Sequence, residues 1–279
     1  TALGERLAAE GHEVFGLRRS PEGLPSPIEP VAADLSGVSS LREALPGELD
    51  LVFYTASPGC STDEAYELAY VRGPRNLFAA LRERGESPRR VVFTTSTGVY
   101  GQSDGEWVDE TSPTEPQRSS GRRLLEGERT VLGGPFPAVV LRLGGIYGPG
   151  RTRAMDRARE VPPEDEPPAY TNRIHRDDCA GALRHLALLE DAEPVYLGVD
   201  HEPAERRVVA GWLAARLPAP AGEESSEEEA APREPAPRAR GPFRGGSGKR
   251  CSNARLVASG YTFRYPTFRE GFAALLPEA

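Results

Sequence analysis

Apolar runs of strand length alternate with helical segments along the first half of the chain. The segment 1–10 has Leu3 and Leu7 four residues apart and Gly11 just past its end, which predicts a helix. The segment 62–84 predicts a second helix from its apolar stripe. The strand-length runs are His12–Leu17, Val31–Leu35, Leu49–Thr55, Val91–Thr95 and Ala138–Leu143. Such alternation predicts an α/β fold in which a doubly wound parallel sheet carries helices on both faces.

The second half of the chain is less regular. A helix is expected to begin at Asp177 or Asp178, followed by a strand at 194–199 and a helical stripe over 208–217. Residues 218–248 are rich in Pro, Gly, Ala and Glu, so they cannot bury enough apolar surface to offset the entropy of ordering. We expect a disordered linker or loop there, and a solvated linker is favoured over a docking segment.

Polar and glycine residues directly follow two of the predicted strands. The run 91–95 leads into Ser96 and Thr97, and the run 138–143 leads into Gly144 and Gly145. In an open α/β sheet, ligands bind beyond the carboxyl ends of the strands, so the two strand ends suggest a shared crevice. A buried strand that ends in an ordinary Ser/Thr turn remains the alternative.

The composition limits the partners that the chain can take. The net charge of −8 argues against a general nucleic-acid binder, because there is no basic excess to neutralise phosphates. No apolar run reaches about 18 residues, so we expect no membrane partner, and no signal peptide opens the sequence. Cys60, Cys179 and Cys251 are too widely spaced for a disulfide framework or a zinc pattern. We therefore expect a cytoplasmic protein with reduced thiols, monomeric or homodimeric, that takes a small-molecule substrate.

Two residue types occur once each. Met155 is the only methionine, so Thr1 is not expected to be a natural start. Lys249 is the only lysine among 34 basic residues, so chemistry that needs an amine side chain has a single candidate. Lys249 lies far along the chain and reaches the strand ends only if the chain folds back.

Several strand ends carry motifs of one family. The stretch Thr95–Gly101 resembles the fifth strand end of the short-chain dehydrogenase/reductase superfamily, in its extended, NAD-dependent epimerase/dehydratase branch. The segment 11–19, with Arg18 and Arg19, resembles the first helix end and second strand of its Rossmann half. Further matching pieces, some of them typical of an atypical subgroup, are Ala33–Leu35, Tyr54–Ser57, Arg142–Gly150, Asn172–Asp178, Lys249–Asn253 and Tyr265–Pro266.

The resemblance implies a Rossmann-like fold that binds NADP, or alternatively NAD. It implies an NAD(P)-binding region over residues 1–150 and a small C-terminal substrate-binding region formed by residues 151–217 and 249–279. The implied cofactor-binding residues are Arg18, Arg19, Asp34, Leu35, Thr55, Ala56, Ser57, Thr95, Gly144 and Ile146. Ser96 matches the family's catalytic hydroxyl. The implied substrate-binding residues are Thr97, Tyr100, Gly145, Arg151, Arg173 and His175.

Most of these residues also have a structural alternative. An arginine after the family's second strand pairs with the 2′-phosphate of NADP, which we favour, and a solvent-exposed arginine pair is the alternative for Arg18 and Arg19. Asp34 can cap a turn, and the small residues 55–57 fit tight packing as well as a cofactor. Arg173 fits an anionic group of a substrate or a salt bridge.

Two further side chains resemble reacting groups. Tyr100 is the nearest phenol to Ser96, but the family has a tyrosine at that place for packing. His175 stands beside Asp177 and Asp178. No second histidine lies at ligand spacing, so we expect a hydrogen-bonded structural residue and no metal.

The glycine-rich turn of the family is absent from the sequence. Its Gly-x-x-Gly-x-x-Gly pattern lets backbone N–H groups approach the pyrophosphate at a helix N-terminus. The helix that should follow this turn begins at Thr1, so we infer truncation. Residues 1–150 would then lack the first strand and the phosphate loop, and we expect weakened dinucleotide binding.

The family's tyrosine and lysine pair is absent as well. The lysine lowers the pKa of the tyrosine, because an unperturbed phenol with a pKa of about 10 is a poor base at neutral pH. The corresponding stretch 116–128 aligns in two ways, with Arg118 and Arg122 or with Ser120 and Leu124 at the pair. Neither alignment supplies a group that titrates near neutral pH.

Two functions are compatible with these features. The leading one is an NAD(P)-binding protein of the epimerase/dehydratase type, an oxidoreductase or epimerase-like enzyme that acts on a carbonyl or nucleotide-sugar-like substrate. The retained strand end Gly144–Arg151 favours it. The alternative is a catalytically inactive dinucleotide-binding sensor or scaffold, which the missing pair favours.

Overall fold

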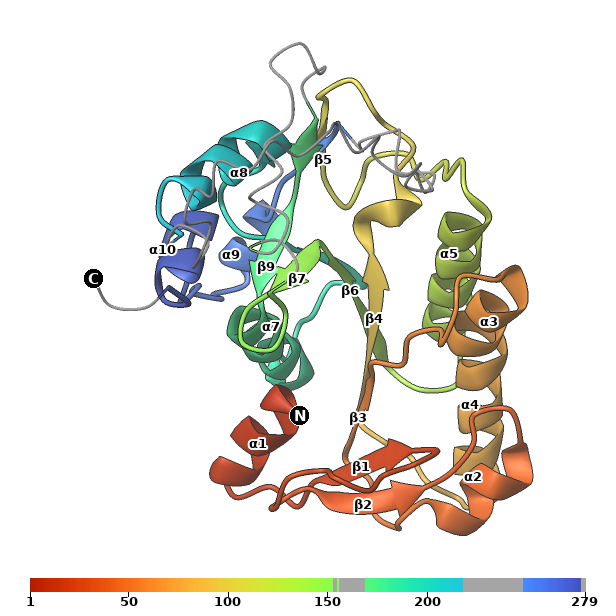
Figure 1. Cartoon of the computed structure of the whole chain (residues 1–279). Coiled ribbons are helices and arrows are strands. Elements are labelled where there is room, and N and C mark those ends of the chain that lie inside the picture. The colour runs from red at the N-terminus through yellow and green to blue at the C-terminus, as the bar shows by residue number, and fades with distance from the viewer. Residues whose placement is uncertain (153–154, 156–168, 218–247, 277–279) are drawn as a thin grey trace, which may run out of the picture.

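The central sheet of the structure consists of four parallel strands. The computed structural model describes residues 1–152, 155, 169–217 and 248–276. Across the sheet the strands follow the order β10–β6–β4–β3 (Figure 1). Their bounds are Leu51–Tyr54 for β3, Arg90–Ser96 for β4, Ala138–Leu143 for β6 and Val195–Gly198 for β10. The predicted parallel α/β sheet is confirmed, and β4 and β6 match their predicted runs closely.

A second parallel pair of strands lies on the β3 side of this sheet (Figure 1). β1 (Phe15–Arg18) pairs with β2 (Glu29–Ala32). Both strands are shifted from the predicted runs 12–17 and 31–35. The reason is that β1 pairs with Glu29 and Pro30, which carry no strand signal in the sequence, while residues 34–36 form a turn.

A cavity of about 1340 Å³ lies between β1 and β3. Its apolar lining includes Leu3 and Leu7 of α1 (Ala2–Ala9), Leu17 of β1 and Phe53 of β3. Among the described residues, β1 has β2 as its only strand partner and β3 has only β4. The edges of the two sheets therefore border the same cavity without hydrogen-bonding to each other.

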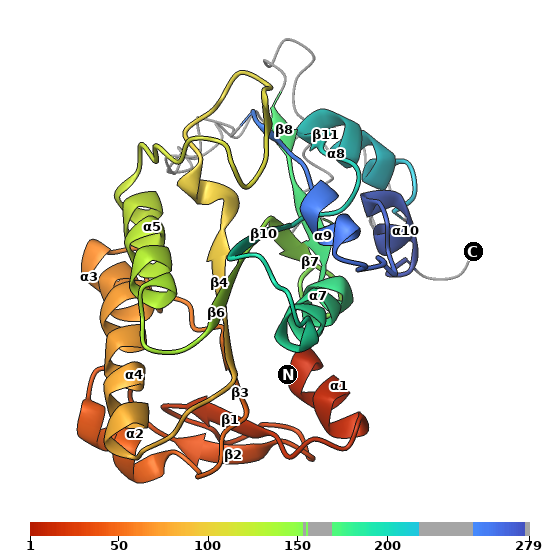
Figure 2. The same ribbon diagram turned by 180° about the vertical axis from the view of Figure 1, so that it is seen from behind.

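Helices cover both faces of the central sheet (Figure 1, Figure 2). One layer consists of α2 (Val38–Ala44), α3 (Asp63–Glu67), the π-helical segment Leu68–Arg72, α4 (Gly73–Glu83) and α5 (Ser119–Leu132). On the other side lie α1 and α7 (Arg176–Leu188). The predicted doubly wound arrangement is confirmed. In the part of the chain that the structure describes, no helix combines the length and the apolar character that crossing a bilayer requires.

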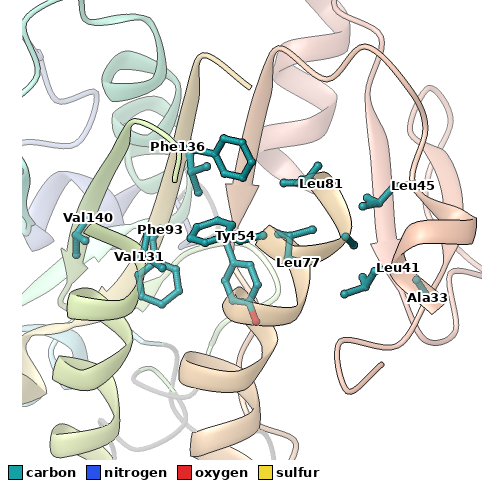
Figure 3. Close-up of a cluster of buried hydrophobic side chains, with 13 residues drawn as sticks. Ala33, Leu41, Leu45, Tyr54, Leu77, Leu81, Phe93, Val131, Phe136 and Val140 are labelled. Carbon is teal, nitrogen blue, oxygen red and sulfur yellow. The ribbon is translucent and has the colours of Figure 1, made fainter. Parts of the chain in front are cut away.

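Phe93 of β4 lies in the core between the sheet and the layer of α4 and α5 (Figure 3). It is fully buried, and its ring centroid lies 5.4 Å from that of Tyr54. The Tyr54 hydroxyl donates a hydrogen bond of 2.7 Å to the Ala69 carbonyl. The preceding residue, Val92, faces the opposite side and packs in the cluster that contains Leu186 of α7. Because side chains alternate along a strand, one apolar run supplies both cores.

Short strands and helices build the remaining region. The strand pairs are β7 (Gly145–Tyr147) with β9 (Arg173–His175), β8 (Tyr170–Thr171) with β11 (Ala204–Glu205) and β5 (Trp107–Val108) with β12 (Arg250–Cys251). The helices are α8 (Arg206–Ala214), α9 (Ala254–Ala258) and α10 (Phe268–Ala273). Because β12 pairs with β5, the C-terminal segment returns to the first half of the chain. The linker expected at 218–248 lies outside the described residues, except for Gly248.

Candidate functional site

Residues at the carboxyl ends of three strands line the cavity beside β1. They end or follow β1, β2 and β3, and α/β proteins bind ligands beyond the carboxyl ends of parallel strands. The structure thus brings seven of the predicted cofactor-binding residues to a single cavity, namely Arg18, Arg19, Asp34, Leu35, Thr55, Ala56 and Ser57. Both arginines are exposed. They present two positive charges at this cavity.

Asp34 caps a turn, which is the structural role that the sequence left open for it. Its Oδ1 accepts a hydrogen bond of 2.8 Å from the backbone N–H of Ser36. This bond holds the pKa of the Asp34 carboxyl below its usual range, so the side chain is a carboxylate at neutral pH. Its backbone N–H donates to Ser40 Oγ at 3.0 Å. Asp34 therefore stabilises the loop after β2 and brings a negative charge to the cavity.

Ser96 ends β4 and begins a short 3₁₀ turn, Thr97–Val99. Its Oγ accepts a hydrogen bond of 3.1 Å from the N–H of Gly98, which leaves the hydroxyl proton available for donation. Ser96 and Thr97 are half-buried. The Gly98 carbonyl lies so close to α5 that a Cβ on Gly121 would approach it to 2.6 Å. The first turn of α5 is therefore packed against the loop that carries Ser96.

A buried ion pair joins β6 to α5 beneath this loop. The side chains of Arg142 and Glu128 meet through Nη2 and Oε2 at 2.7 Å and through Nε and Oε1 at 3.0 Å. Thr95 Oγ1 donates to Glu128 Oε1 at 2.7 Å, so β4 joins the same network. Neither Glu128 nor the pairing of Arg142 was predicted from the sequence. The available signal was an arginine inside the apolar run 138–143, because a charge in a buried strand needs a partner.

Tyr100 and Thr95 are held by this network. Arg142 Nη1 donates to the Tyr100 hydroxyl at 2.7 Å, and that hydroxyl donates to the Asp109 carbonyl at 2.8 Å. Burial raises the pKa of Tyr100 to about 12. These contacts favour the packing role of Tyr100 over proton transfer. The buried Thr95 hydroxyl is likewise occupied by Glu128, and a cofactor contact of Thr95 stays a prediction.

The backbone after β6 is held by neighbouring segments. The N–H of Gly144 donates to the Gly198 carbonyl at 3.0 Å, and the N–H of Gly145 donates to the Asn172 carbonyl at 2.9 Å. A Cβ on Gly144 would lie 2.9 Å from the oxygen of Asn172, so this close approach requires glycine. Ile146 follows in β7, half-buried. Backbone hydrogen bonds therefore fix this strand end, and its ligand contacts stay predictions.

The three remaining residues that were predicted to bind substrate are Arg151, Arg173 and His175. Arg173 and His175 lie in β9, and Arg151 lies in the turn 148–151. The Arg173 guanidinium donates to Thr171, with Nη1 at 3.2 Å from the carbonyl, and lies 5.8 Å from the centroid of the Phe268 ring. Arg151 is exposed, and its N–H donates to the Gly148 carbonyl in a tight turn. Of these two arginines, only Arg151 presents an exposed side chain.

His175 is almost fully buried, with 1% of its surface exposed. Its Nδ1 accepts the N–H of Asp177 at 3.2 Å and so caps α7. Burial lowers the pKa of His175, which favours the neutral ring. Among the described residues, no group of three His, Cys, Asp or Glu side chains is placed to hold a metal ion. Within that part of the chain the three cysteines are free thiols.

Asp200 is a buried carboxyl that the sequence analysis missed. It follows β10, and only 1% of its surface is exposed. Its Oδ1 accepts the N–H of Glu202 at 3.1 Å, whereas Oδ2 has no hydrogen-bond partner among the described residues. Burial raises the pKa of Asp200 to about 8. The available signal was its place directly after the predicted strand 194–199, just as Ser96 directly follows the predicted run 91–95.

The substitution Glu128→Gln tests the buried ion pair. Gln keeps the shape of the side chain but leaves the Arg142 charge buried and unpaired. We expect the free energy of unfolding to fall by about 3–5 kcal/mol, measured by urea denaturation. The matched control is Glu126→Gln on the same helix, whose half-exposed partner Arg123 lies at 3.0 Å. It should cost less than about 1 kcal/mol, and equal losses in both variants would contradict the assignment.

The substitution Asp200→Asn tests the raised pKa. The unfolded state releases this proton near pH 4, whereas the folded state keeps it up to about pH 8. The stability that the protonated carboxyl contributes is therefore complete below about pH 4 and is lost as the pH rises through 8, with a slope of up to about 1.4 kcal/mol per pH unit. We expect Asp200→Asn to remove this slope in urea denaturation between pH 5 and 8. The exposed Asp191→Asn should retain it.

Comparisons with known proteins place this geometry in a family. Residues 1–184 match the model of the NAD dependent epimerase/dehydratase family. Protein YeeZ of Escherichia coli K12 is 31% identical over 203 residues, which cover 66% of this chain and 68% of YeeZ. The match to the family model covers about the first two thirds of the chain.

Solved structures extend the similarity to nearly the whole chain. A structure from Methylobacillus flagellatus, named for the NAD-dependent epimerase/dehydratase type, is 36% identical with a TM-score of 0.74, over 98% of this chain and 92% of its own. The UDP-glucose 4-epimerase of Thermus thermophilus, in complex with NAD, shares the fold at 22% identity with a TM-score of 0.73, over 97% of this chain and 92% of its own. The chain belongs to the NAD-dependent epimerase/dehydratase family.

Proposed function

We propose that the protein binds NADP, or alternatively NAD, at the carboxyl ends of β1, β2 and β3 and uses it in an oxidoreductase or epimerase-like reaction. The observation that carries this proposal is the meeting of the residues after all three strands at one cavity. The family is named for NAD, and the epimerase of Thermus thermophilus binds it. The substrate class that we propose is a carbonyl compound or a nucleotide sugar.

The charges at the cavity favour NADP. Arg18 and Arg19 are exposed at the end of β1, and guanidinium groups pair with phosphate through charge-assisted hydrogen bonds. The backbone of residues 55–57 carries only small side chains, so a cofactor can pass close to it. This donor set fits a phosphorylated ribose.

The cofactor would supply hydride transfer when bound, and the chain would supply the contacts to the substrate. Ser96 keeps its hydroxyl proton free of the turn bond, so it can donate a hydrogen bond to a substrate oxygen. Within residues 116–128 the first turn of α5 presents Ser119 and Ser120 and no phenol or amine. The second candidate is a cofactor-binding sensor or scaffold without catalysis. The absence of a tyrosine or lysine from residues 116–128 favours it.

Arginine substitutions test the cofactor site. We expect Arg18→Ala/Arg19→Ala to weaken NADPH binding by about 10–100-fold and NADH binding much less, because the charged hydrogen bonds to the 2′-phosphate are lost. The measurement is fluorescence titration with both cofactors.

The control for this test is Arg82→Ala/Arg129→Ala, which removes the same charge from exposed helix positions. It should leave both affinities nearly unchanged. Equal losses for NADPH and NADH would contradict the phosphate contact, and no binding of either cofactor to the unsubstituted chain would contradict the function. Binding without turnover of aldehydes or nucleotide sugars would favour the sensor or scaffold.

We also propose that one more parallel strand fits between β1 and β3 and connects to α1 through a glycine-rich turn. The support is the apolar cavity between two strand edges that lack a shared partner among the described residues. A strand in this place, followed by α1 and β1, forms a right-handed βαβ unit. It would occupy the apolar part of the cavity and leave the strand-end residues for the cofactor.

An N-terminal extension tests this added strand. A version of the chain that carries an apolar strand and a Gly-x-x-Gly-x-x-Gly turn before Thr1 should melt at a higher temperature and bind NADPH more tightly. The physical reason is that paired edges and buried apolar side chains stabilise the sheet, while the turn offers N–H groups to the pyrophosphate. An extension of scrambled sequence and equal length is the control. Equal melting temperatures would contradict the added strand.

A further inference from the structure

Lys249, the only lysine of the chain, is held rigidly where the C-terminal segment meets the first half of the chain. The Asn172 side chain fixes its backbone from both sides. Asn172 Nδ2 donates to the Lys249 carbonyl at 3.1 Å, and Asn172 Oδ1 accepts the N–H of Cys251 at 2.7 Å. The adjacent β12 pairs in parallel with β5. Two independent sets of hydrogen bonds therefore set the position of this lysine.

The Lys249 side chain points into the protein. In β12 the Arg250 side chain faces the other way, with its guanidinium 5.1 Å from the centroid of the Trp107 ring. Lys249 is 2% exposed, and Cys251 is 1% exposed. Because side chains alternate along an extended backbone, these two buried side chains share one face.

That inner face meets the loop that follows Ser96. Lys249 Nζ donates to the Tyr100 carbonyl at 3.4 Å, four residues beyond Ser96 in the sequence. Cys251 packs in the same apolar cluster as Leu124 of α5. In one of the two alignments with the family, Leu124 stands where the family has the lysine of its tyrosine and lysine pair. The amine of a lysine that is distant in the sequence therefore lies against the loop after Ser96, whereas α5 itself contains no lysine.

The surroundings of Nζ do not favour a charge. Among the described residues, the charged and titratable groups that act on it are Cys251 of β12, Arg118 at the start of α5 and Glu106 beside β5. Burial, the strongest influence, lowers the pKa of Lys249, and the charge of Arg118 lowers it as well, whereas Cys251 and Glu106 act in the opposite direction. Within the described part of the chain Nζ makes one hydrogen bond, of 3.4 Å, and a buried amine with so little compensation is costly for a purely structural residue. Such groups concentrate at functional sites.

We propose that Lys249 is the proton-transfer residue of the Ser96 strand end, an inference that rests on the proposed function. In the oxidative direction, neutral Nζ takes the hydroxyl proton of the substrate and becomes an ammonium. The carbon–oxygen bond becomes a carbonyl as the C–H bond breaks and its electron pair leaves as hydride to the oxidised nicotinamide of NAD(P). Reduction runs in reverse. The hydrogen bond of 3.4 Å to Tyr100 is longer than usual, so Nζ can exchange it for a substrate oxygen at little cost.

Because the chain has a single lysine, the pKa of Lys249 can be measured by NMR without resonance assignment. Protein labelled with carbon-13 at the lysine Cε gives one lysine signal, whose chemical shift follows the protonation of Nζ as the pH is raised. We expect an apparent pKa below the ordinary value of about 10.4, because the amine is buried. Saturation with NADP+ should lower it further than saturation with NADPH, because the positive nicotinamide ring repels an ammonium nearby.

The matched control moves the lysine by one residue. Lys249→Arg/Arg250→Lys keeps the charge of β12 but places the only amine on the outer face, where we expect a pKa of about 10.4 and no response to either cofactor. Lys249→Met should bind NADPH as the unsubstituted chain does and lose at least about 100-fold in turnover of any substrate in the aldehyde and nucleotide-sugar panel.

The outcomes separate this inference from the proposed function. Failure of NADPH and NADH to bind overturns the proposed function and this inference with it. Cofactor binding together with an ordinary Lys249 pKa, equal values with NADP+ and NADPH, or full turnover of Lys249→Met overturns the role of Lys249 alone. The titration of the unsubstituted protein decides the matter even where Lys249→Met fails to fold.

Discussion

The ion pair between Arg142 and Glu128 is the contact on which the candidate site depends. It places two opposite charges in the interior, where leaving either one unpaired costs several kcal/mol. Its hydrogen bonds to Thr95 and Tyr100 join β6, α5, β4 and the loop after β4. Because Ser96 directly follows Thr95, the same contact sets the position of the serine. The rigidity of this strand end therefore comes from buried polar groups as well as from apolar packing.

The candidate site has two chemically different parts. At the ends of β1, β2 and β3, two arginines and small side chains border a large cavity, which suits a phosphorylated cofactor. Beyond the end of β4, the loop after Ser96 packs against the first turn of α5, and Lys249 of the C-terminal segment donates to the Tyr100 carbonyl of that loop. The first part relies on strand ends close together in the sequence. The second part exists only because the chain returns and pairs β12 with β5.

The periodicity of the sequence predicted most of the central sheet but not its neighbours. The runs 91–95 and 138–143 carry β-branched and apolar residues on both faces, so β4 and β6 were readily predicted. β2 was misplaced because it contains Glu29 and Pro30, which only an edge strand tolerates. The alternation implied a helix between the runs 91–95 and 138–143, but the bounds of α5 were not predicted, because its buried face interrupts the apolar residues Leu124 and Val131 with Gly127 and Glu128. Glu128 is acceptable there only because Arg142 is its partner.

The sequence by itself determined the alternation of strands and helices, the place of Ser96 at a strand end and the presence of a single amine side chain. These are local properties, since side-chain periodicity and residue identity do not depend on distant neighbours. Only the tertiary structure decided that Tyr100 is held by Arg142, 42 residues away, and that Lys249 reaches the Tyr100 carbonyl across 149 residues. The protonation of a buried group depends on the charges and the solvent around it. That environment exists only once the chain has folded.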